Sequence, residues 1–334
     1  MRKRQHGAIA KGLLQRGGGR RVESTVQRLA RDISRTHALT TVPVAVLDCA
    51  ASLQLPIVRS ELTTDGGLVD WSTSSCRILL PKQPPVQLGA RRRERFTIAH
   101  EIGHFVIRRY LRDTVPLRVF ETHSAEEEYL CNIFAGELLV PAERLARDAE
   151  RYGLTAQGIL TLMDRYDVSL HVLGINLRHL FGTAIFLTTW GETDDGFVAT
   201  SVAPGPKEHV ELVRSEGTTI HLAALTQKEE SGVDSFYVGA RLVRWQCWSI
   251  AIGLRRVLTV GLRADLWHRY TDQIQEKPTP VPLRSAPEVV TPGLVLQTSL
   301  PFEEAYRTRT ARSHATTSRA PRLSELTPRR VAHR

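Results

Sequence analysis

Residues 95–107 read RFTIAHEIGHFVI and place two histidines, His100 and His104, in an otherwise apolar run. Side chains four positions apart lie on the same face of an α-helix. Both imidazoles can therefore reach one metal ion, at about 2.0–2.1 Å if the ion is zinc. Glu101 lies about 100° around the helix from His100, where it is better suited to take a proton from water than to bind the metal. The stretch predicts the metal-binding helix of a hydrolase.

The competing interpretation of this stretch is a buried helix whose histidines are satisfied by hydrogen bonds alone. Two histidines and a glutamate are costly in so apolar a run unless something pairs them. This cost favours the metal site.

A catalytic zinc site needs a third protein ligand, and residues 124–141, SAEEEYLCNIFAGELLVP, supply candidates. The apolar residues of this segment predict a second amphipathic helix. Its small residues Ala135 and Gly136 allow close packing on the first helix, as does Gly103 beside the second histidine.

The segment carries several candidates for the third ligand. Glu126 and Glu127 are assigned to a solvated charged face, whereas Glu128 continues into the body of the helix and is the expected ligand. His123 is the rival ligand. Cys131 is expected to be a small core residue, because a free cysteine packs as a small apolar side chain.

The composition bounds the class of protein. With 334 residues and 42% hydrophobic residues, the chain can bury a core in two or three domains. It has no apolar run of about 18 residues, which argues against a membrane span, and its start lacks the apolar region of a secretory signal. Four scattered cysteines without CxxC spacing fit reduced thiols and a cytoplasmic protein.

The positive charge is concentrated at the two ends of the chain. Residues 1–22 hold seven Lys or Arg and no acidic residue, and residues 276–334 hold ten basic and five acidic residues. The ends thus carry +12 of a chain net of +10, which leaves about −2 for residues 23–275. We therefore expect solvated tails with at most weak, non-specific contact to nucleic acid.

Hydrophobic periodicity changes along the chain. A helix is expected around 24–37 with Ser24 as its N-cap, followed by a short helix and strands up to about residue 83 and by helices from about 94 to 181. Within the helical part, residues 154–180 predict two helices joined by a tight turn, with Thr155 and Ser169 as N-caps. Past residue 182 the apolar pattern alternates, which predicts a β-rich region with one or two helices.

The two motifs together resemble the ImmA/IrrE family of metallo-endopeptidases. RFTIAHEIGHF followed by EYLCNIFAGELLVP is similar to the family's (R/Q)RFTxAHExGH helix and its E-x-x-x-N-x-x-A-x-x-(L/I)-(L/M)-x-P helix, and the resemblance covers about residues 23–180. Carried over by position, it implies zinc ligands at His100, His104 and Glu128 and a general base at Glu101.

The residue patterns and the resemblance together give an expected fold, and the resemblance also implies a substrate. The expected fold is α+β: a zincin-like minimal metallopeptidase, with a small antiparallel sheet plus helices, then a helix-turn-helix-like segment and a β-rich C-terminal domain. The implied substrate is a DNA-binding repressor of the XRE helix-turn-helix type, cleaved to relieve repression during stress.

On this basis the chain is divided into five parts. They are a basic disordered tail (1–22), a metallopeptidase domain (23–152), a helix-turn-helix-like segment (153–181), a β-rich, GAF-like domain (182–275) and a disordered Pro/Arg-rich tail (276–334). The second helix of the helix-turn-helix-like segment offers few donors for bases, which favours a supporting role over DNA reading.

The remaining expectations concern substrate and cofactor. An extended substrate is expected to add as a strand along 76–81, with Arg77, Ile78 and Leu79 as contacts. His123 and Tyr129 are candidates for stabilising the oxyanion. Zn²⁺ is the expected ion, although Mn²⁺ or Fe²⁺ also suits such ligands. The alternatives to a protease are a metal-stapled regulator without catalysis and an antitoxin-like partner that captures a repressor or DNA.

Overall fold

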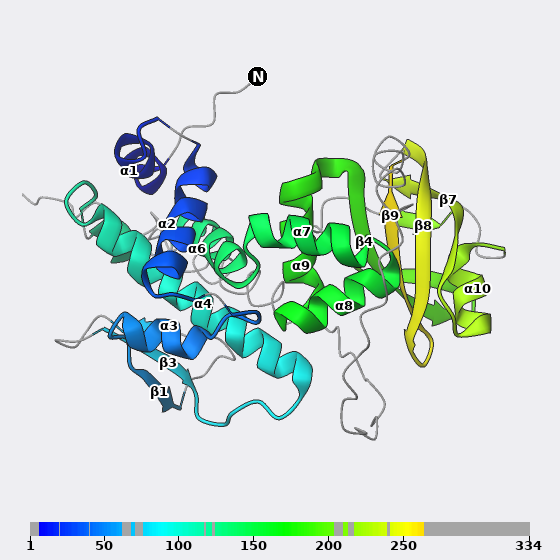
Figure 1. The fold of residues 1–334 in the computed structure, drawn as a ribbon, viewed down its shortest axis with the longest axis horizontal. Coiled ribbons are helices and arrows are strands. Elements are labelled where there is room, and N and C mark those ends of the chain that lie inside the picture. Colours follow the sequence, from blue (N-terminus) through cyan, green and yellow to red (C-terminus); the bar gives the residue numbers. More distant parts are fainter. Residues whose placement is uncertain are drawn as a thin grey trace, which may run out of the picture. The chain divides into compact units, whose positions relative to one another are not determined.

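The computed structural model describes residues 7–263, apart from residues 20, 40, 62–67, 71–75, 117, 122–123, 204–209, 213–216 and 239–240. The chain folds as α+β, with helices and a small sheet in its first part and a six-stranded antiparallel sheet after residue 184 (Figure 1). The α+β prediction is therefore confirmed. No described helix is both long and apolar enough to cross a membrane. The predicted tail 276–334 lies outside the described residues.

The first two helices correct the expected N-terminal boundary. Helix α1 (Ala8–Arg16) lies within the segment predicted to be a disordered tail, and α2 (Val22–Thr36) begins after Arg21 rather than at Ser24. The prediction of disorder is wrong for α1 because Ile9 and Leu13, four positions apart, are fully buried. The many basic residues of this stretch concealed a short apolar stripe.

A short helix and a small sheet follow. Helix α3 (Val46–Ser52) leads into β1 (Ile57–Ser60), and β2 (Leu68–Asp70) and β3 (Arg77–Pro81) complete a sheet of order β1-β3-β2. Strand β3 pairs parallel with β1 and antiparallel with β2, so the sheet is mixed and the expectation of an antiparallel sheet holds for one pair alone.

Two packed helices form the centre of the first part. They are α4 (Leu88–Leu111), which contains the HEIGH residues, and α6 (Ala125–Leu139), which packs against it; the short α5 (Arg118–Glu121) lies between them in sequence. The helices approach most closely at Gly103, where a Cβ would lie 3.3 Å from the Cα of Cys131 and 3.2 Å from Phe134. The prediction that Gly103 allows close approach is confirmed.

Three further helices follow: α7 (Ala142–Tyr152), α8 (Ala156–Tyr166) and α9 (Leu170–Phe181). Thr155 accepts a hydrogen bond from the Gly158 amide and Ser169 from the Val172 amide, so both predicted N-caps are confirmed. A left-handed residue, Asp167, makes the turn between α8 and α9. This geometry confirms the two helices and the turn, whereas DNA recognition by them stays a prediction.

The larger sheet begins after a 3-10 turn (Gly182–Ala184). Its strand order is β5-β4-β9-β8-β7-β6, all antiparallel, and the bounds are β4 (Ile185–Thr193), β5 (Gly196–Ala203), β6 (Val210–Leu212), β7 (Glu230–Val238), β8 (Arg241–Gly253) and β9 (Arg256–Leu262). Helix α10 (Thr219–Thr226) packs against β7, β8 and β9. The predicted β-rich region with a helix is confirmed.

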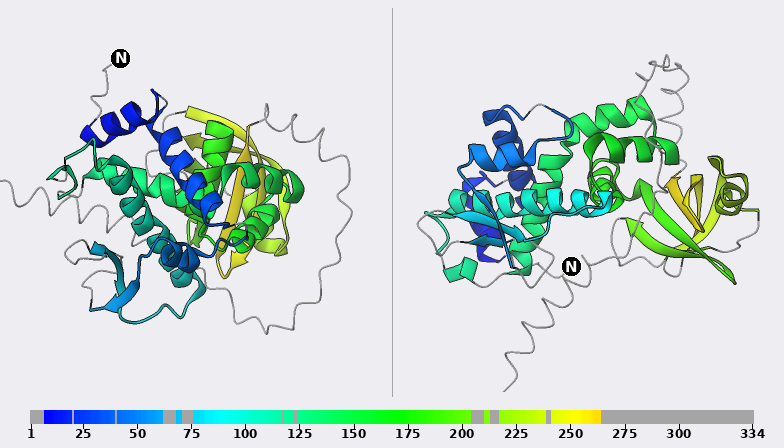
Figure 2. Two further views of the ribbon diagram at one scale, coloured as in Figure 1. Left: turned by 60° about the vertical axis from the view of Figure 1, so that its left-hand side comes forward. Right: turned by 90° about the horizontal axis from the view of Figure 1, so that it is seen from below.

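Both faces of the larger sheet are buried, so side chains that alternate along a strand enter two different cores. In β4, Ile185 and Leu187 join the core that includes α8 and α9, whereas Phe186 and Trp190 join a second core with α10. The strands of β4, β8 and β9 accordingly lie beside α8 and α9 (Figure 2).

Candidate metal centre

Helix α4 directs two imidazoles at the same point. His100 and His104 are 8% and 5% exposed, and their Nε2 atoms lie 3.2 Å apart. Their rings meet edge to face, with centroids 4.9 Å apart. The four-residue spacing thus produces the arrangement that the helix period predicts.

The outer nitrogen of each imidazole is held by helix α6. Nδ1 of His100 lies 2.9 Å from Oδ1 of Asn132, and Nδ1 of His104 lies 3.0 Å from Oε1 of Glu127. An amide oxygen and a carboxylate oxygen only accept hydrogen bonds, so each Nδ1 is the donor. In a neutral imidazole, Nε2 then carries the lone pair. Both lone pairs point to the space between the two rings.

Glu128 of α6 adds a third acceptor at the same place. Its Oε2 lies 3.2 Å from Nε2 of His100, and its Oε1 lies 3.5 Å from Nε2 of His104. Three lone-pair atoms so close together repel one another unless a cation lies between them. Metal–ligand bonds of about 2.0–2.2 Å in a tetrahedral site place neighbouring ligand atoms about 3.3–3.6 Å apart. The donor set therefore fits a metal ion in both spacing and chemistry.

The electrostatics of the three groups agree with this fit. Burial acts to raise the pKa of Glu128, but its hydrogen bonds to His100 and His104 outweigh burial and lower that pKa. Burial likewise opposes protonation of His104, but interactions with Cys131, Glu127 and Glu128 raise its pKa well above the usual value. Both shifts indicate that the surrounding groups stabilise positive charge at this point, whether a proton or a metal ion carries it. The structure thus brings together His100, His104 and Glu128, whose assignment as ligands stays a prediction.

Glu127 departs from its predicted place on a solvated face. Its side chain is fully buried and pairs with Arg108, whose Nε lies 2.6 Å from Oε1 of Glu127. Arg108 also donates to the carbonyl oxygen of Phe120, at 3.0 Å. Glu126 is also not merely solvated, since its Oε1 accepts from the Gly7 amide at 3.1 Å. The sequence feature that could have indicated a buried Glu127 is Arg108, which lies one helical turn after His104 and supplies the counter-charge.

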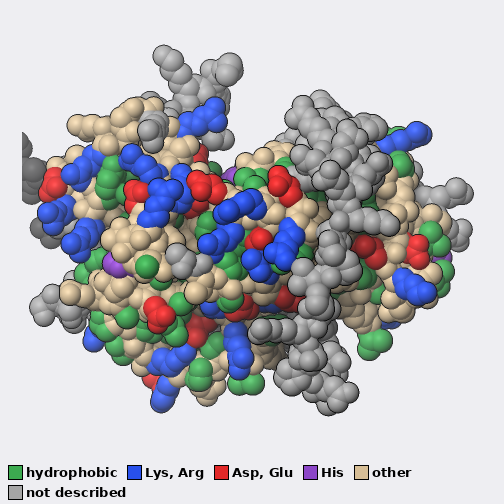
Figure 3. All heavy atoms as spheres, viewed as in Figure 1, with side chains coloured by type: hydrophobic (Ala, Val, Ile, Leu, Met, Phe, Trp, Pro, Cys, Tyr) green, Lys and Arg blue, Asp and Glu red, His purple; other side chains and the backbone are tan. Residues whose placement is uncertain are grey.

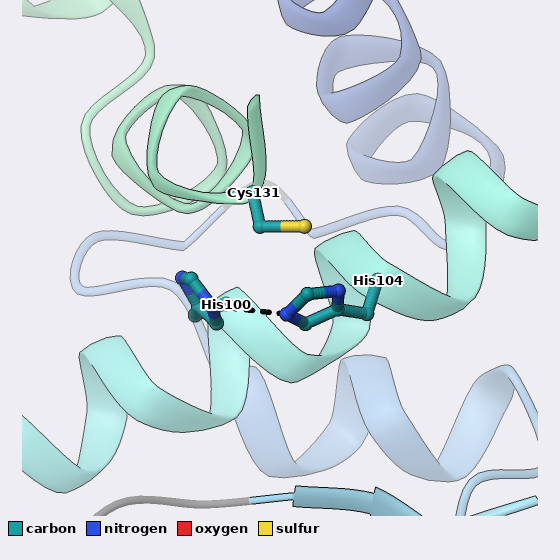
Figure 4. A group of neighbouring side chains, drawn as sticks. All are labelled: His100, His104 and Cys131. Carbon is teal, nitrogen blue, oxygen red and sulfur yellow. Dashed lines mark hydrogen bonds between the residues drawn. The ribbon is translucent and has the colours of Figure 1, made fainter. Parts of the chain in front are cut away.

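Cys131 is the residue at the site that the sequence interpretation missed. It is fully buried, as expected of a core residue, and burial raises the pKa of its thiol to about 11. Its side chain nevertheless points from α6 toward both imidazoles (Figure 4), and the ligand atoms of His100, His104 and Cys131 lie within 4.8 Å of one another. The thiol is therefore a further donor beside Glu128. It lies on the same face of α6 as Glu128, three residues later.

Glu101 lies on α4 beside the first histidine and is 6% exposed. No residue in the described part of the chain hydrogen-bonds to its carboxylate or pairs with it. The carboxylate is thus available to water or substrate, as a general base must be. Its catalytic role stays a prediction.

The predicted substrate strand is wrong in one respect. Residues Arg77, Ile78 and Leu79 lie on β3, which is paired on both sides, by β1 and by β2. A strand that is already paired on both sides has no free backbone groups for a substrate. Of the candidates for the oxyanion, Tyr129 is 51% exposed on α6, and His123 lies outside the described residues.

Comparisons with known proteins agree with the motifs. Residues 88–178, from α4 into α9, match the family model of the IrrE N-terminal-like domain, Peptidase_M78. Over 82 residues the chain is 34% identical to the radiation response metalloprotease IrrE of Deinococcus radiodurans, which covers 23% of this chain and 24% of that protein. The matching stretch thus spans about a quarter of the length of this relative.

Among solved structures, a transcriptional regulator from Mycobacterium tuberculosis is similar, at 13% sequence identity and a TM-score of 0.42. The alignment covers 78% of this chain and 82% of the regulator. A similarity at this level does not establish a shared fold.

Proposed function

We propose that the protein is a metal-dependent endopeptidase of the ImmA/IrrE family with zinc as its ion, because residues 88–178 match the family model of the IrrE N-terminal-like domain. One observation carries the proposal. The lone pairs of two imidazoles and a carboxylate converge in a buried space, while Asn132 and Glu127 engage both outer nitrogens. Histidines that bind metals are usually fixed by such outer hydrogen bonds.

His100, His104 and Glu128 would hold the ion. A bound zinc ion would supply Lewis-acid chemistry, polarising a peptide carbonyl and lowering the pKa of water. The hydrogen bonds to Asn132 and Glu127 fix the two rings and leave an Nε2 lone pair on each ring to bind a metal ion. Arg108 keeps Glu127 ionised, because the hydrogen bonds of this carboxylate to His104 and Arg108 lower its pKa against the effect of burial.

Glu101 would move the protons of the reaction. Its carboxylate takes a proton from the attacking water and returns it to the amine that leaves when the peptide bond breaks. Its carboxylate is buried and accepts no hydrogen bond from the residues that the structure describes, so it can hold the attacking water.

The substrate class rests on the family resemblance. We propose a DNA-binding repressor of the XRE helix-turn-helix type, bound in extended form. Because β3 is internal, the substrate would pair with an outer strand of the described sheet, and β2 is favoured because it packs next to α4.

One observation favours a second function. If Cys131 binds the ion together with Glu128 and the two histidines, four protein ligands close the site, as in structural zinc sites. The protein would then be a metal-stapled regulator that binds a repressor without cutting it.

Glu101→Gln separates the two functions. Cells expressing wild-type or variant protein are compared by labelling new protein N-termini, with Glu94→Gln on the same helix as the control, since Glu94 pairs with Arg59 near the surface. For a protease, a repressor is cut with wild type and with Glu94→Gln, and cutting falls by about 100-fold or more with Glu101→Gln. Purified Glu101→Gln should keep its metal. No Glu101-dependent cut would contradict the protease and favour the regulator.

A further inference from the structure

A cavity of about 460 Å³ opens beside α7 and α8 and is separate from the metal centre. The lining residues are predominantly basic: Val42, Arg144, Arg147, Asp148, Arg151 and Arg165. In the space-filling view, basic side chains gather over α7 (Figure 3). We infer that this cavity is a binding site for a small phosphorylated anion.

The arginines converge because of the helix period. One face of α7 carries three arginines, because they recur at spacings of three and four residues: Arg144, Arg147 and Arg151. Arg165 of α8 completes the wall. Gathering like charges in this way costs free energy, which a bound anion would offset.

Among the described residues of the lining, the one acidic group is already engaged. Asp148 is 7% exposed, and its Oδ2 accepts hydrogen bonds from Nε of Arg165 at 2.7 Å and from the Tyr166 hydroxyl at 2.8 Å. The four arginines and one aspartate that the structure describes in the lining give it a formal charge of +3.

Arg147 and Arg151 are the groups best placed to bind a ligand. Both are exposed; Nε of Arg147 donates to the Glu143 carbonyl of its own helix at 3.3 Å, and the Arg151 guanidinium lies 5.4 Å from the centroid of the Tyr152 ring. Among the residues that the structure describes, no carboxylate pairs with either arginine. Their guanidinium groups therefore retain donors for an anion.

The size and chemistry of the cavity select the ligand. A volume of about 460 Å³ suits a small molecule, and Val42 is the one apolar residue in the described part of the lining. Guanidinium groups bind phosphate with paired hydrogen bonds, and a diphosphate carries enough charge to offset +3. Nucleic acid is disfavoured because it needs an extended basic surface, whereas residues 23–275 carry about −2 in total.

The test is calorimetric titration of the full chain with sodium pyrophosphate. We expect saturable binding that weakens by tenfold or more in Arg147→Ala/Arg151→Ala. The matched control is Arg91→Ala/Arg93→Ala, which removes two exposed arginines of α4 and should leave the affinity unchanged. Both pairs are exposed, so thermal melting without ligand should stay at the wild-type value.

Two results would overturn the inference. The first is an absence of saturable binding, or an equal loss in both double variants, which would mean non-specific attraction to a basic chain. The second is binding of a DNA duplex that depends on Arg147 and Arg151 when pyrophosphate does not bind, which would assign the cavity to nucleic acid. Because the cavity lies outside the metal centre, neither result bears on the proposed protease.

Discussion

Two clusters of buried polar side chains can be compared in this chain, one between α4 and α6 and one in the larger sheet. In the sheet, the indole N–H of Trp190 donates to the Thr259 hydroxyl at 3.0 Å. The hydroxyls of Thr259, Ser249 and Thr219 follow at 2.7 Å per step, and Thr219 donates to the carboxylate of Asp234. Every donor of this relay has an acceptor within the protein.

The cluster between α4 and α6 lacks this balance. Its outer hydrogen bonds are satisfied, but at its centre Nε2 of His100, Nε2 of His104 and the Glu128 carboxylate all offer lone pairs. Both clusters are buried, so burial does not distinguish them. What distinguishes them is whether donors and acceptors balance, and the unbalanced cluster needs a cation to complete it. Only that cluster is expected to bind metal.

The strongest test of the difference between the two clusters is removal of the Glu128 carboxylate from the centre of the cluster between α4 and α6. Glu128→Ala should lower zinc affinity by at least about 100-fold, because a ligand is lost rather than an outer partner. Competition with a chromogenic chelator measures the affinity. Glu126→Ala is the control, since its carboxylate bonds to Gly7 instead. Equal affinities in the two variants would remove Glu128 from the ligand set.

A smaller loss is expected from an outer partner of the same cluster. Asn132→Ala deletes the acceptor that fixes His100, and should lower zinc affinity by about 10–100-fold. Asn176→Ala is the control, because it removes another buried asparagine, whose amide bonds to the Val172 carbonyl of its own helix. It should leave the zinc affinity unchanged. A similar affinity in both variants would mean that the ring of His100 needs no such support.

The sequence predicts which residues share a face of one helix better than it predicts how the neighbouring helix is rotated against that face. The spacing of His100 and His104 predicts their shared face, because both lie on a single helix. Three consecutive glutamates on α6 point about 100° apart, and only packing decides which one reaches the Nε2 atoms of the histidines. In the structure Glu126 reaches Gly7, Glu127 reaches Arg108 and Nδ1 of His104, and Glu128 reaches Nε2 of both imidazoles.

The order of strands in the small sheet is likewise not predictable from the sequence. The apolar run within residues 76–81 predicts a strand, and β3 is one, but no local pattern shows that β1 and β2 pair on either side of it. Short apolar stripes among charges are a further limit, as α1 shows, because composition averaged over residues 1–22 outweighs two buried side chains. What the sequence leaves open is set by tertiary packing.

A substitution in the hydroxyl cluster of the larger sheet should change the free energy of unfolding and leave the zinc content unchanged. Thr259→Val keeps the shape of the side chain but leaves the buried indole N–H of Trp190 without its acceptor, at a cost of about 1–3 kcal/mol. Urea denaturation measures the change in free energy of unfolding, and zinc stoichiometry should stay at the wild-type value. Thr161→Val, whose hydroxyl donates to its own helix at Gln157, should cost about 0.5 kcal/mol or less. A loss of zinc in Thr259→Val would show that the clusters are coupled.

The smallest change in zinc affinity is expected for Cys131→Ala. This variant tests which side chains complete the ligand set between α4 and α6. If Glu128 is the third ligand, Cys131→Ala changes zinc affinity by less than about tenfold, below the effect of an outer partner. Cobalt-loaded wild type should then lack the near-ultraviolet charge-transfer band of a thiolate ligand. Cys49→Ala is the matched control, because Cys49 is also free and fully buried but lies on α3. A band present in wild type and Cys49→Ala but absent in Cys131→Ala would make the thiol a ligand. The cluster would then be completed by four protein donors, and the regulator would displace the protease as the favoured function.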